Sequence, residues 1–500
     1  MKTGILFAGA LLLSATAASG QTLRIGLLDD PDLLDPAPGK SFVGRIVFQS
    51  LCDKLVDISP DLKILPRLAL SWDITEDGKV ITFKLRDGVT FHDGEKFDAA
   101  AVKFNIDRDK TMPESIRKSD LASVESVDVI DPLTVRFTLK KPDSTLLAAL
   151  TDRAGMMVAP EAAKQAGAKF GLNPVCSGPY KFVERVQQDH ITLARYPNYW
   201  NAKAFAFDKI VFRTIPDSTA RLASLRSGDL DMVERVEPTD VKELEAQKDF
   251  KVTSIVSLGY QGLTVNVANG PQSKTPIGQD KRIRQALSLA IDRQGLMDAV
   301  FDGQFIPGFQ AVPPVSPYYS DKFPPPKRDL EKAKALLKAA GLEHPVINVR
   351  YPTSSRAQKV MEVVQAMAAE AGFDIKLIST EFATQMKLQT DGDYEVVQIG
   401  WSGRPDPDGN IYSFYVCGGG LNDNHYCNPE VDKILADTRL TTDVAARKAL
   451  YEKFDAIVID EQPIIYLYFE KWIWGTTAKL AGFVPYPDGM IRLEGVKLAQ

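Results

Sequence analysis

The sequence predicts an α/β protein with two α/β bodies, one of which carries an antiparallel insertion. Three observations lead to this prediction. Near the N-terminus a strand pattern leads into a helix pattern, which is how an α/β unit opens. Residues 71–86 have the pattern of a hairpin, and residues 346–377 have that of a strand, a helix and a second strand. The 500 residues are enough for about three folding units.

In the first half of the chain, the elements follow from the spacing of apolar residues. Residues 23–27 alternate as in a strand, and apolar residues recur every four positions over 43–55, as in a helix. The hairpin of residues 71–86 turns at Asp77-Gly78, a pair that favours tight turns. A further helix is expected from Ala99 onward.

The second half is more plainly α/β. Apolar residues at helical spacing predict an amphipathic helix over 283–291. After the Pro-rich segment 323–326, Asp329 can cap a helix that stops at Gly341. Residues 346–377 then form a predicted β-α-β crossover, which is right-handed by default.

The first 20 residues have the layout of a secretory signal. Lys2 is followed by the apolar run 5–13 and by the small-residue stretch 15–20. We expect cleavage near Gly20, and no cysteine stands there to take a lipid. No later stretch reaches the ~20 apolar residues that a membrane span needs. The expected location is therefore the periplasm, with the protein not embedded in the membrane.

The charge composition disfavours nucleic acid as a partner. The chain has a net charge of −5 and no long charge runs, which argues against nucleic acid because phosphates need a basic surface. No motif predicts a cofactor. Hydrophobic residues make up 44% of the chain, enough for sizeable cores.

The four cysteines suit an oxidising compartment and can pair in three ways. A local bridge between Cys417 and Cys427 is the simplest, and it would leave Cys52 with Cys176. Zinc bound by Cys417, His425 and Cys427 is the alternative. The usual paired-ligand spacing of zinc sites is missing there, so disulfides are favoured.

Several segments resemble, in the expected order, the family 5 extracellular solute-binding proteins of ABC importers, the dipeptide-, oligopeptide- and opine-binding type. The strongest is 68–97, with Asp77-Gly78 and Phe91-His92-Asp93-Gly94. The other segments are 173–180, 198–200, 215–217, 228–231, 282–292 and 426–430. The resemblance covers essentially the whole chain after the predicted signal.

The resemblance implies a two-lobed, Venus-flytrap fold of type II, cluster C. Lobe I would be an α/β domain of residues 21–54, 184–264 and 483–500, with 55–183 as an inserted, mostly β subdomain. Lobe II would be the α/β domain 265–482. In such folds the ligand lies between the lobes at the carboxyl ends of strands, and binding is coupled to hinge closure. The implied partners are the permease and ATPase subunits of an importer, and we expect a monomer that docks at the inner membrane.

The first candidate for the ligand site is the segment that follows the apolar strand 396–399. It should emerge at the carboxyl end of that strand, where ligands bind. Aromatic side chains there can supply a wall for the ligand. The predicted ligand-binding residues are Trp401, Ser402, Gly403, Arg404 and Tyr412 in lobe II, and Ser41 and Phe42 in lobe I.

Two departures from the dipeptide-binding members predict the kind of ligand. Those members have, after Gly-Trp-x-Gly, an aspartate that pairs with the free amine of the ligand. Here the position is Arg404, whose planar fork suits carboxylate or phosphate. They also place an arginine and a tyrosine just before the helix that starts here near Ala357. By register Tyr351 and Thr353 stand there, with Arg356 nearby.

We therefore expect a small anionic ligand, such as an opine, a sugar-phosphate conjugate or a modified peptide, rather than an ordinary di- or oligopeptide. The competing interpretation of Arg404 is an ion pair with Asp406 or Asp408 in a surface loop. A secreted hydrolase that uses Ser402 or a pair of carboxylates is the alternative from another class. It is disfavoured because the sequence contains no His-Glu-x-x-His, Gly-x-Ser-x-Gly or P-loop motif, so we expect no enzyme. A metal-chelate or haem carrier is disfavoured by the presence of only four histidines.

Overall fold

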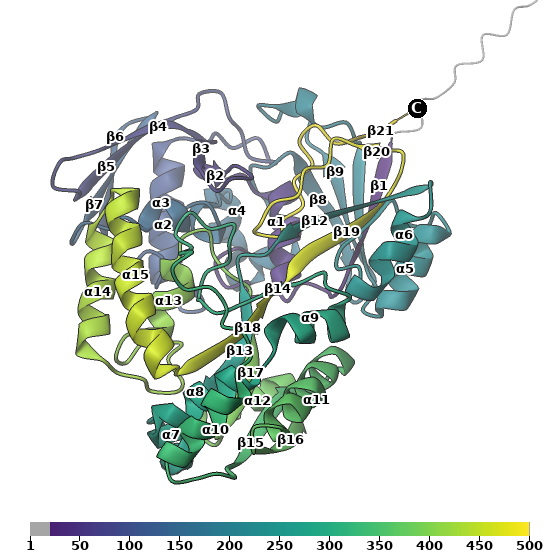
Figure 1. The fold of residues 1–500 in the computed structure, drawn as a ribbon. Helices are drawn as coiled ribbons and strands as arrows, with labels where there is room; N and C mark the ends of the chain where they lie inside the picture. The colour runs from purple at the N-terminus through teal and green to yellow at the C-terminus, as the bar shows by residue number, and fades with distance from the viewer. Residues whose placement is uncertain (1–20, 500) are drawn as a thin grey trace, which may run out of the picture.

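The computed structural model describes residues 21–499, and the predicted signal, residues 1–20, lies outside this range. The described chain is built on three larger sheets with helices packed against them, as the predicted α/β class requires (Figure 1). None of the helices between residues 21 and 499 combines the length and apolar character needed to cross a membrane.

A seven-stranded mixed sheet forms the core of the first lobe. The predicted first strand is its centre, because β1 pairs in parallel with β10 and with β11. Leu23, Ile25 and Leu27 of β1 are buried, as their alternation predicts. In order across the sheet, the strands are β12 (Phe250–Val256), β19 (Lys471–Thr477), β11 (Met232–Val233), β1 (Thr22–Leu27), β10 (Lys209–Thr214), β9 (His190–Arg195) and β8 (Tyr180–Val186).

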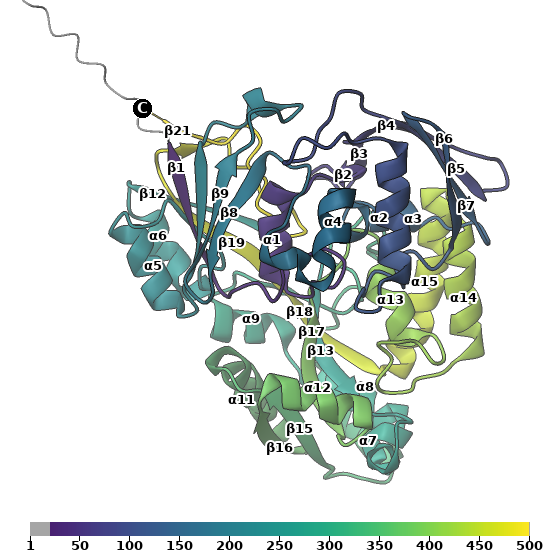
Figure 2. The same ribbon diagram turned by 180° about the vertical axis from the view of Figure 1, so that it is seen from behind.

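A four-stranded antiparallel sheet, the predicted insertion, completes the first lobe. Its strands in order are β4 (Ala69–Ile74), β5 (Val80–Leu85), β7 (Thr134–Leu139) and β6 (Val124–Asp131). The hairpin β4–β5 turns at Gly78, whose φ of +65° suits glycine. Seen from behind, α1 (Phe42–Leu51), α2 (Ala99–Thr111) and α4 (Pro160–Ala166) lie between the two sheets of this lobe (Figure 2).

A six-stranded sheet forms the second lobe. The predicted β-α-β crossover is confirmed, because β15 and β16 are parallel and α11 (Ser355–Ala369) joins them. The helix α10 (Leu330–Ala339) begins at the predicted cap Asp329, which accepts a hydrogen bond from Lys332 N. In order, the strands are β14 (Ile306–Pro307), β18 (Ile464–Phe469), β13 (Tyr260–Val265), β17 (Val396–Trp401), β15 (Val346–Pro352) and β16 (Asp374–Thr380).

The remaining elements are short strand pairs and helices. The strand pairs are β2 (Val56–Ile58) with β3 (Ile64–Pro66), and β20 (Leu480–Ala481) with β21 (Lys497–Leu498). The helices are α3 (Leu146–Ala149), α5 (Ser218–Arg226), α6 (Val241–Glu245), α7 (Pro276–Gln279), α8 (Lys281–Ala290), α9 (Arg293–Phe301), α12 (Phe382–Asp391), α13 (Asp408–Tyr415), α14 (Pro429–Leu440) and α15 (Val444–Glu461).

The chain passes between the seven-stranded and six-stranded sheets at two neighbouring places. The first crossing is residues 257–259, between β12 and β13, and the second is Glu470, between β18 and β19. Ser257 N donates to Glu470 O at 2.8 Å, so the two crossings lie side by side. Two short adjacent connections between lobes are the usual form of a hinge.

The strand pairing differs from the predicted lobe bounds at the second crossing. The predicted range 265–482 places β19 in the second lobe, whereas β19 pairs with β11 and β12 of the first. The apolar run 464–474 is interrupted only by Glu470 and Lys471, so nothing in its pattern marks the passage from one sheet to the next. The strand β8 likewise begins at Tyr180, before the predicted bound of 184.

Both disulfides have the pairing that the sequence favours. Cys52, at the end of α1, is bonded to Cys176, which lies shortly before β8. Cys417 is bonded to Cys427. The zinc alternative is therefore wrong, because both thiols that would bind the metal are already in a disulfide.

The two bridges should differ in their contribution to stability. The Cys52–Cys176 bridge spans 124 residues and the Cys417–Cys427 bridge spans 10, and the longer loop removes more conformational entropy from the unfolded chain. Replacing both cysteines of the long bridge by alanine should cost about 5 kcal/mol, and of the short bridge about 3 kcal/mol. Urea unfolding measures both, and equal losses would contradict the entropic explanation.

His92 fixes a turn near the first disulfide. Its Nδ1 accepts from Cys176 N at 3.3 Å and its Nε2 lies 3.0 Å from Gly178 O, an arrangement that suits the neutral ring with the proton on Nε2. Burial lowers the pKa of His92 to about 4. The folded protein therefore holds this ring neutral at pH values where the unfolded chain would protonate it.

This shift predicts an acid-sensitive contribution to stability. The folded pKa lies below the unfolded value near 6.5, so the contribution is complete above pH 6.5 and is lost as the pH falls toward 4. The loss should approach about 3 kcal/mol below pH 4. Urea unfolding of wild type and His92→Gln between pH 4 and 7 isolates it, because glutamine keeps one donor and one acceptor but does not titrate. Parallel pH curves for the two proteins would show that His92 does not contribute.

Candidate functional site

The loop of residues 401–404, at the carboxyl end of β17, is held by a side chain that the sequence did not single out. Asn410 Oδ1 accepts hydrogen bonds from Trp401 Nε1 at 3.1 Å and from Arg404 N at 2.8 Å. Its Nδ2 donates to Leu258 O, in the first crossing, at 3.1 Å. The bond to Leu258 O is buried and the other two are partly buried, so water competes little for this buried amide. One amide thus ties the 401–404 loop to the hinge.

Two glycines bring the same loop and the first crossing into close backbone contact. Gly403 has a φ of +81°, and a Cβ there would lie 2.1 Å from the carbonyl carbon of Leu258. A Cβ on Gly259 would lie 1.8 Å from Trp401 O. Only glycine fits either position, because any side chain would force the two backbones apart.

Arg404 projects from this loop without a carboxylate partner. Its guanidinium lies 4.6 Å from the centre of the Trp401 ring, and its Nη1 donates to Gly403 O at 2.7 Å. Within residues 21–499 no ion pair holds it. Asp406 binds Arg447 and Asp408 binds Arg439, each pair including a 2.7 Å contact. The interpretation of Arg404 as the partner of Asp406 or Asp408 is therefore wrong.

Charged side chains of the first lobe face Arg404. We call Arg45, Arg117, Asp120, Asp152, Arg153 and Arg404 the interlobe cluster, because all five first-lobe members interact electrostatically with Arg404 or with its neighbours in this set. Arg45 Nε lies 3.1 Å from Asp152 Oδ2, and Arg117 Nη1 lies 3.0 Å from Asp120 Oδ2. No motif or periodicity marks these residues, since they come from α1 and from two separate segments of the insertion.

Burial and crowding perturb the protonation of this cluster. Burial, reinforced by the charge of Arg45, lowers the pKa of Arg404 to about 10. Burial also lowers the pKa of Arg153 to about 9, against the attraction of Asp152. Although burial opposes it, the guanidinium groups of Arg45 and Arg153 hold the pKa of Asp152 well below its usual range. The arginines are thus placed where their positive charge is unfavourable unless more negative charge arrives.

The two residues predicted from the first lobe have different surroundings. Phe42 stacks on Trp472 at 4.6 Å between ring centres, and the guanidinium of Arg45 lies 5.8 Å from its ring. Phe42 is therefore next to the interlobe cluster. Ser41 caps α1 by accepting from Gly44 N, and its hydroxyl donates to Asp32 at 2.7 Å. These bonds give Ser41 a local structural role.

Of the other predicted residues of the second lobe, some lie in the loop of Arg404 and one contacts a different arginine. Trp401 packs edge-on against Phe414 at 5.1 Å between ring centres, and Ser402 Oγ lies 3.4 Å from Arg404 Nη1, so both belong to the loop of Arg404. The ring of Tyr412 instead lies under Arg439, 3.3 Å from its guanidinium.

Tyr351, Thr353 and Arg356 are not brought to Arg404. Tyr351 is buried in the core of the second lobe, and Thr353 Oγ1 is hydrogen-bonded to Ser379 Oγ. Arg356 Nη2 lies 2.6 Å from Glu237 Oε2 of the first lobe, which makes it an ion pair between lobes. In the described chain no hydrogen bond or ion pair joins these three residues to the 401–404 loop.

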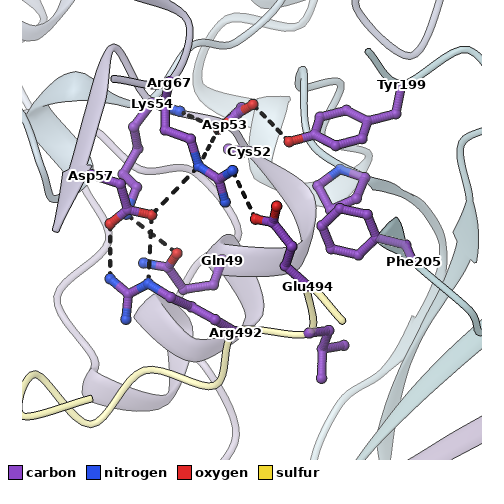
Figure 3. Close-up of a pocket in the computed structure, with 12 residues that line it drawn as sticks. Gln49, Cys52, Asp53, Lys54, Asp57, Arg67, Tyr199, Phe205, Arg492 and Glu494 are labelled. Carbon is purple, nitrogen blue, oxygen red and sulfur yellow. Dashed lines mark hydrogen bonds and ion pairs between the residues drawn. The ribbon is translucent and has the colours of Figure 1, made fainter. Parts of the chain in front are cut away.

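A second group of charges, which we call the C-terminal ion network, fastens the end of the chain to the first lobe (Figure 3). Lys54 Nζ and Arg492 Nη2 lie 2.7 and 2.9 Å from Asp57 Oδ1. Arg67 Nη1 lies 2.9 Å from Glu494 Oε2. Its charges satisfy one another, so it has the form of a structural network rather than a binding site.

Because Gly403 contacts the hinge backbone, adding one methyl group there should strongly lower the free energy of unfolding. Gly403→Ala should cost about 3 kcal/mol or more, because the backbone of Leu258 must move. Gly418→Ala is the matched control, since Gly418 has a φ of +70° but open space around its Cβ, and should cost about 1 kcal/mol. Urea unfolding compares the two, and equal losses would show that backbone conformation alone matters.

Comparisons with known proteins agree with this architecture. Residues 63–422 match the model of the bacterial extracellular solute-binding proteins, family 5. The chain is 30% identical to the glutathione-binding protein GsiB of Pectobacterium atrosepticum, over 93% of this chain and 92% of that one. It is 27% identical to the dipeptide-binding protein of Escherichia coli, over 99% of both chains.

Solved structures share the fold along nearly the whole chain. The periplasmic binding protein DppA of Helicobacter pylori, in complex with the peptide STSA, superposes with a TM-score of 0.84 at 26% identity, covering 96% of this chain and 98% of that one. The binding protein AgaA of Agrobacterium tumefaciens, in complex with agropinic acid, has a TM-score of 0.80 at 26% identity, covering 96% and 99%. These neighbours are two-lobed type II binding proteins, which confirms the predicted fold. The chain belongs to family 5 of the bacterial extracellular solute-binding proteins.

Proposed function

We propose that this protein captures a small anionic ligand between its lobes in the periplasm and delivers it to the permease of an ABC importer. The role in import follows from family membership, and the negative charge of the ligand is inferred from the site. The observation that supports an anionic ligand is the position of Arg404. Its guanidinium stands at the carboxyl end of β17, faces the first lobe and has no carboxylate partner among the described residues.

The chemistry of this position favours carboxylate or phosphate. A guanidinium presents its N–H groups in a planar fork that matches these anions, and it repels an ammonium group. An ordinary dipeptide would therefore present its free amine to the wrong charge. Relatives bind glutathione, a dipeptide or agropinic acid, according to their names, so the fold accommodates varied small molecules. We favour an opine, a sugar-phosphate conjugate or a modified peptide.

The 401–404 loop can couple ligand binding to closure of the lobes, because it connects the ligand site to the hinge. Asn410 connects Trp401 and Arg404 to the carbonyl of Leu258 in the hinge. A ligand held by Arg404 and by the first lobe would stabilise the closed arrangement, because it would bind that arrangement more tightly than the open one. The permease and ATPase subunits would then recognise the closed monomer.

Identification of the ligand tests the proposal. We expect mass spectrometry of material released on denaturation to find a small anion, recovered unaltered. At one hundred times its dissociation constant the ligand should stabilise the protein by about 2.7 kcal/mol, a thermal shift of about 2 to 4 °C. Arg404→Ala should abolish this shift.

The control is Arg282→Ala, because Arg282 lies on the surface of α8 and pairs with Asp280. It should leave the shift intact. Unchanged affinity in Arg404→Ala would remove Arg404 from the site, and a neutral or cationic ligand would contradict the anionic proposal. Recovery of a chemically altered ligand would favour the hydrolase alternative.

A further inference from the structure

We propose that the ligand presents two negative charges to the interlobe cluster, one to Arg404 of the second lobe and one to Arg117 and Arg153 of the first. This inference rests on the proposed binding of an anion at Arg404 and adds the number and the position of its charges. It assigns a ligand-binding role to Arg117 and Arg153, which the sequence did not single out.

Positive and negative charges do not balance in the interlobe cluster. The interlobe cluster contains four guanidinium groups and two carboxylates, Asp120 and Asp152. Asp152 is shared, with Arg45 Nε at 3.1 Å and Arg153 Nε at 3.7 Å, and Asp120 pairs with Arg117. Two positive charges therefore lack a counterpart in this cluster.

The surrounding charged groups do not remove this excess. Arg108 and Asp35 form a bidentate pair and cancel each other. Asp109 also lies near Arg117, and burial, which raises its pKa well above the usual range, disfavours its charged form. Because Arg108 and Asp35 cancel each other and Asp109 is disfavoured as a carboxylate, the interlobe cluster keeps an excess of positive charge.

The C-terminal ion network, by contrast, carries no surplus positive charge. That network includes three cations and four carboxylates, and each cation has an ion pair within it. Its members are Lys54, Arg67, Arg492, Asp53, Asp57, Asp488 and Glu494. A buried cluster that is left with surplus positive charge is costly, and an anionic ligand would relieve that cost.

Two arginines of the interlobe cluster have unused hydrogen-bonding capacity. The Nε atoms of Arg117 and Arg153 are buried and have no hydrogen-bond partner within residues 21–499. Both arginines are at least nine-tenths buried, being 6% and 2% exposed. Buried N–H groups of this kind are normally satisfied, and a carboxylate or phosphate oxygen is the acceptor that guanidinium groups favour.

The positions of the arginines imply the shape of the ligand. Arg404 comes from the second lobe, whereas Arg117 and Arg153 come from the insertion of the first, so a ligand with two negative charges would join the lobes directly. A single monoanionic group could compensate only half of the excess, whereas two carboxylates, or one phosphate monoester with close to two charges at neutral pH, could compensate all of it. The class of ligand is thus a small dianion, either a dicarboxylate or a molecule that carries a phosphate monoester.

Matched probes test the number of charges without knowledge of the natural ligand. Succinate and monomethyl succinate form one pair, and inorganic phosphate and dimethyl phosphate form the other. Calorimetry and thermal unfolding at pH 7.5 and constant ionic strength give their affinities. We expect each dianion to bind wild type at least tenfold more tightly than its monoanionic partner. Arg153→Gln should bring this ratio close to one, and Arg404→Gln should weaken both members of each pair.

If Arg153→Gln does not fold, Arg117→Gln serves as the second variant, because it removes a charge from the same part of the cluster. Equal binding of dianions and monoanions to wild type would overturn the inference, as would the absence of saturable binding by any probe. A ratio that is unchanged in the folded variants would overturn the roles of Arg117 and Arg153. If Arg404 is needed for the natural ligand but the ratio is one, the proposed function stands and only this inference fails.

Discussion

The close contact between the 401–404 loop and the first crossing is the constraint on which the rest of the site depends. Gly403 and Gly259 allow the two backbones to touch, and Asn410 fixes them with three hydrogen bonds. The loop that presents Arg404 is consequently part of the hinge region and not an independent surface loop. A movement of the lobes must carry the guanidinium with it, which couples the position of the charge to closure.

The position of Arg404 matters because of the charges that surround it. The interlobe cluster keeps an excess of guanidinium groups, whereas the C-terminal ion network satisfies its own charges and holds the chain end in place. Arginines that repel one another in a buried setting oppose closure of the empty protein, and an anion would reverse that effect. The same residues would then determine both the affinity for the ligand and the preference for the closed state.

The sequence predicted those features that depend on residues close together in the chain. Alternation located β1, helical spacing located α8 and α10, and Asp77-Gly78 located a turn, because each depends on residues within a few positions. The position of Arg404 was also predicted, from the strand that precedes it. Arg117, Arg153 and Asn410 were missed, since their roles depend on contacts between segments far apart in the chain. Tyr351 was proposed from register alone, and its strand turns it into the core.

A crystal structure of the protein with its identified ligand would test the proposed role of Arg404. We expect an anionic group of the ligand within hydrogen-bonding distance of the Arg404 guanidinium, in a closed protein whose 401–404 loop still contacts Leu258. A ligand whose charged groups all lie away from Arg404, or one that binds without contacts to both lobes, would contradict it.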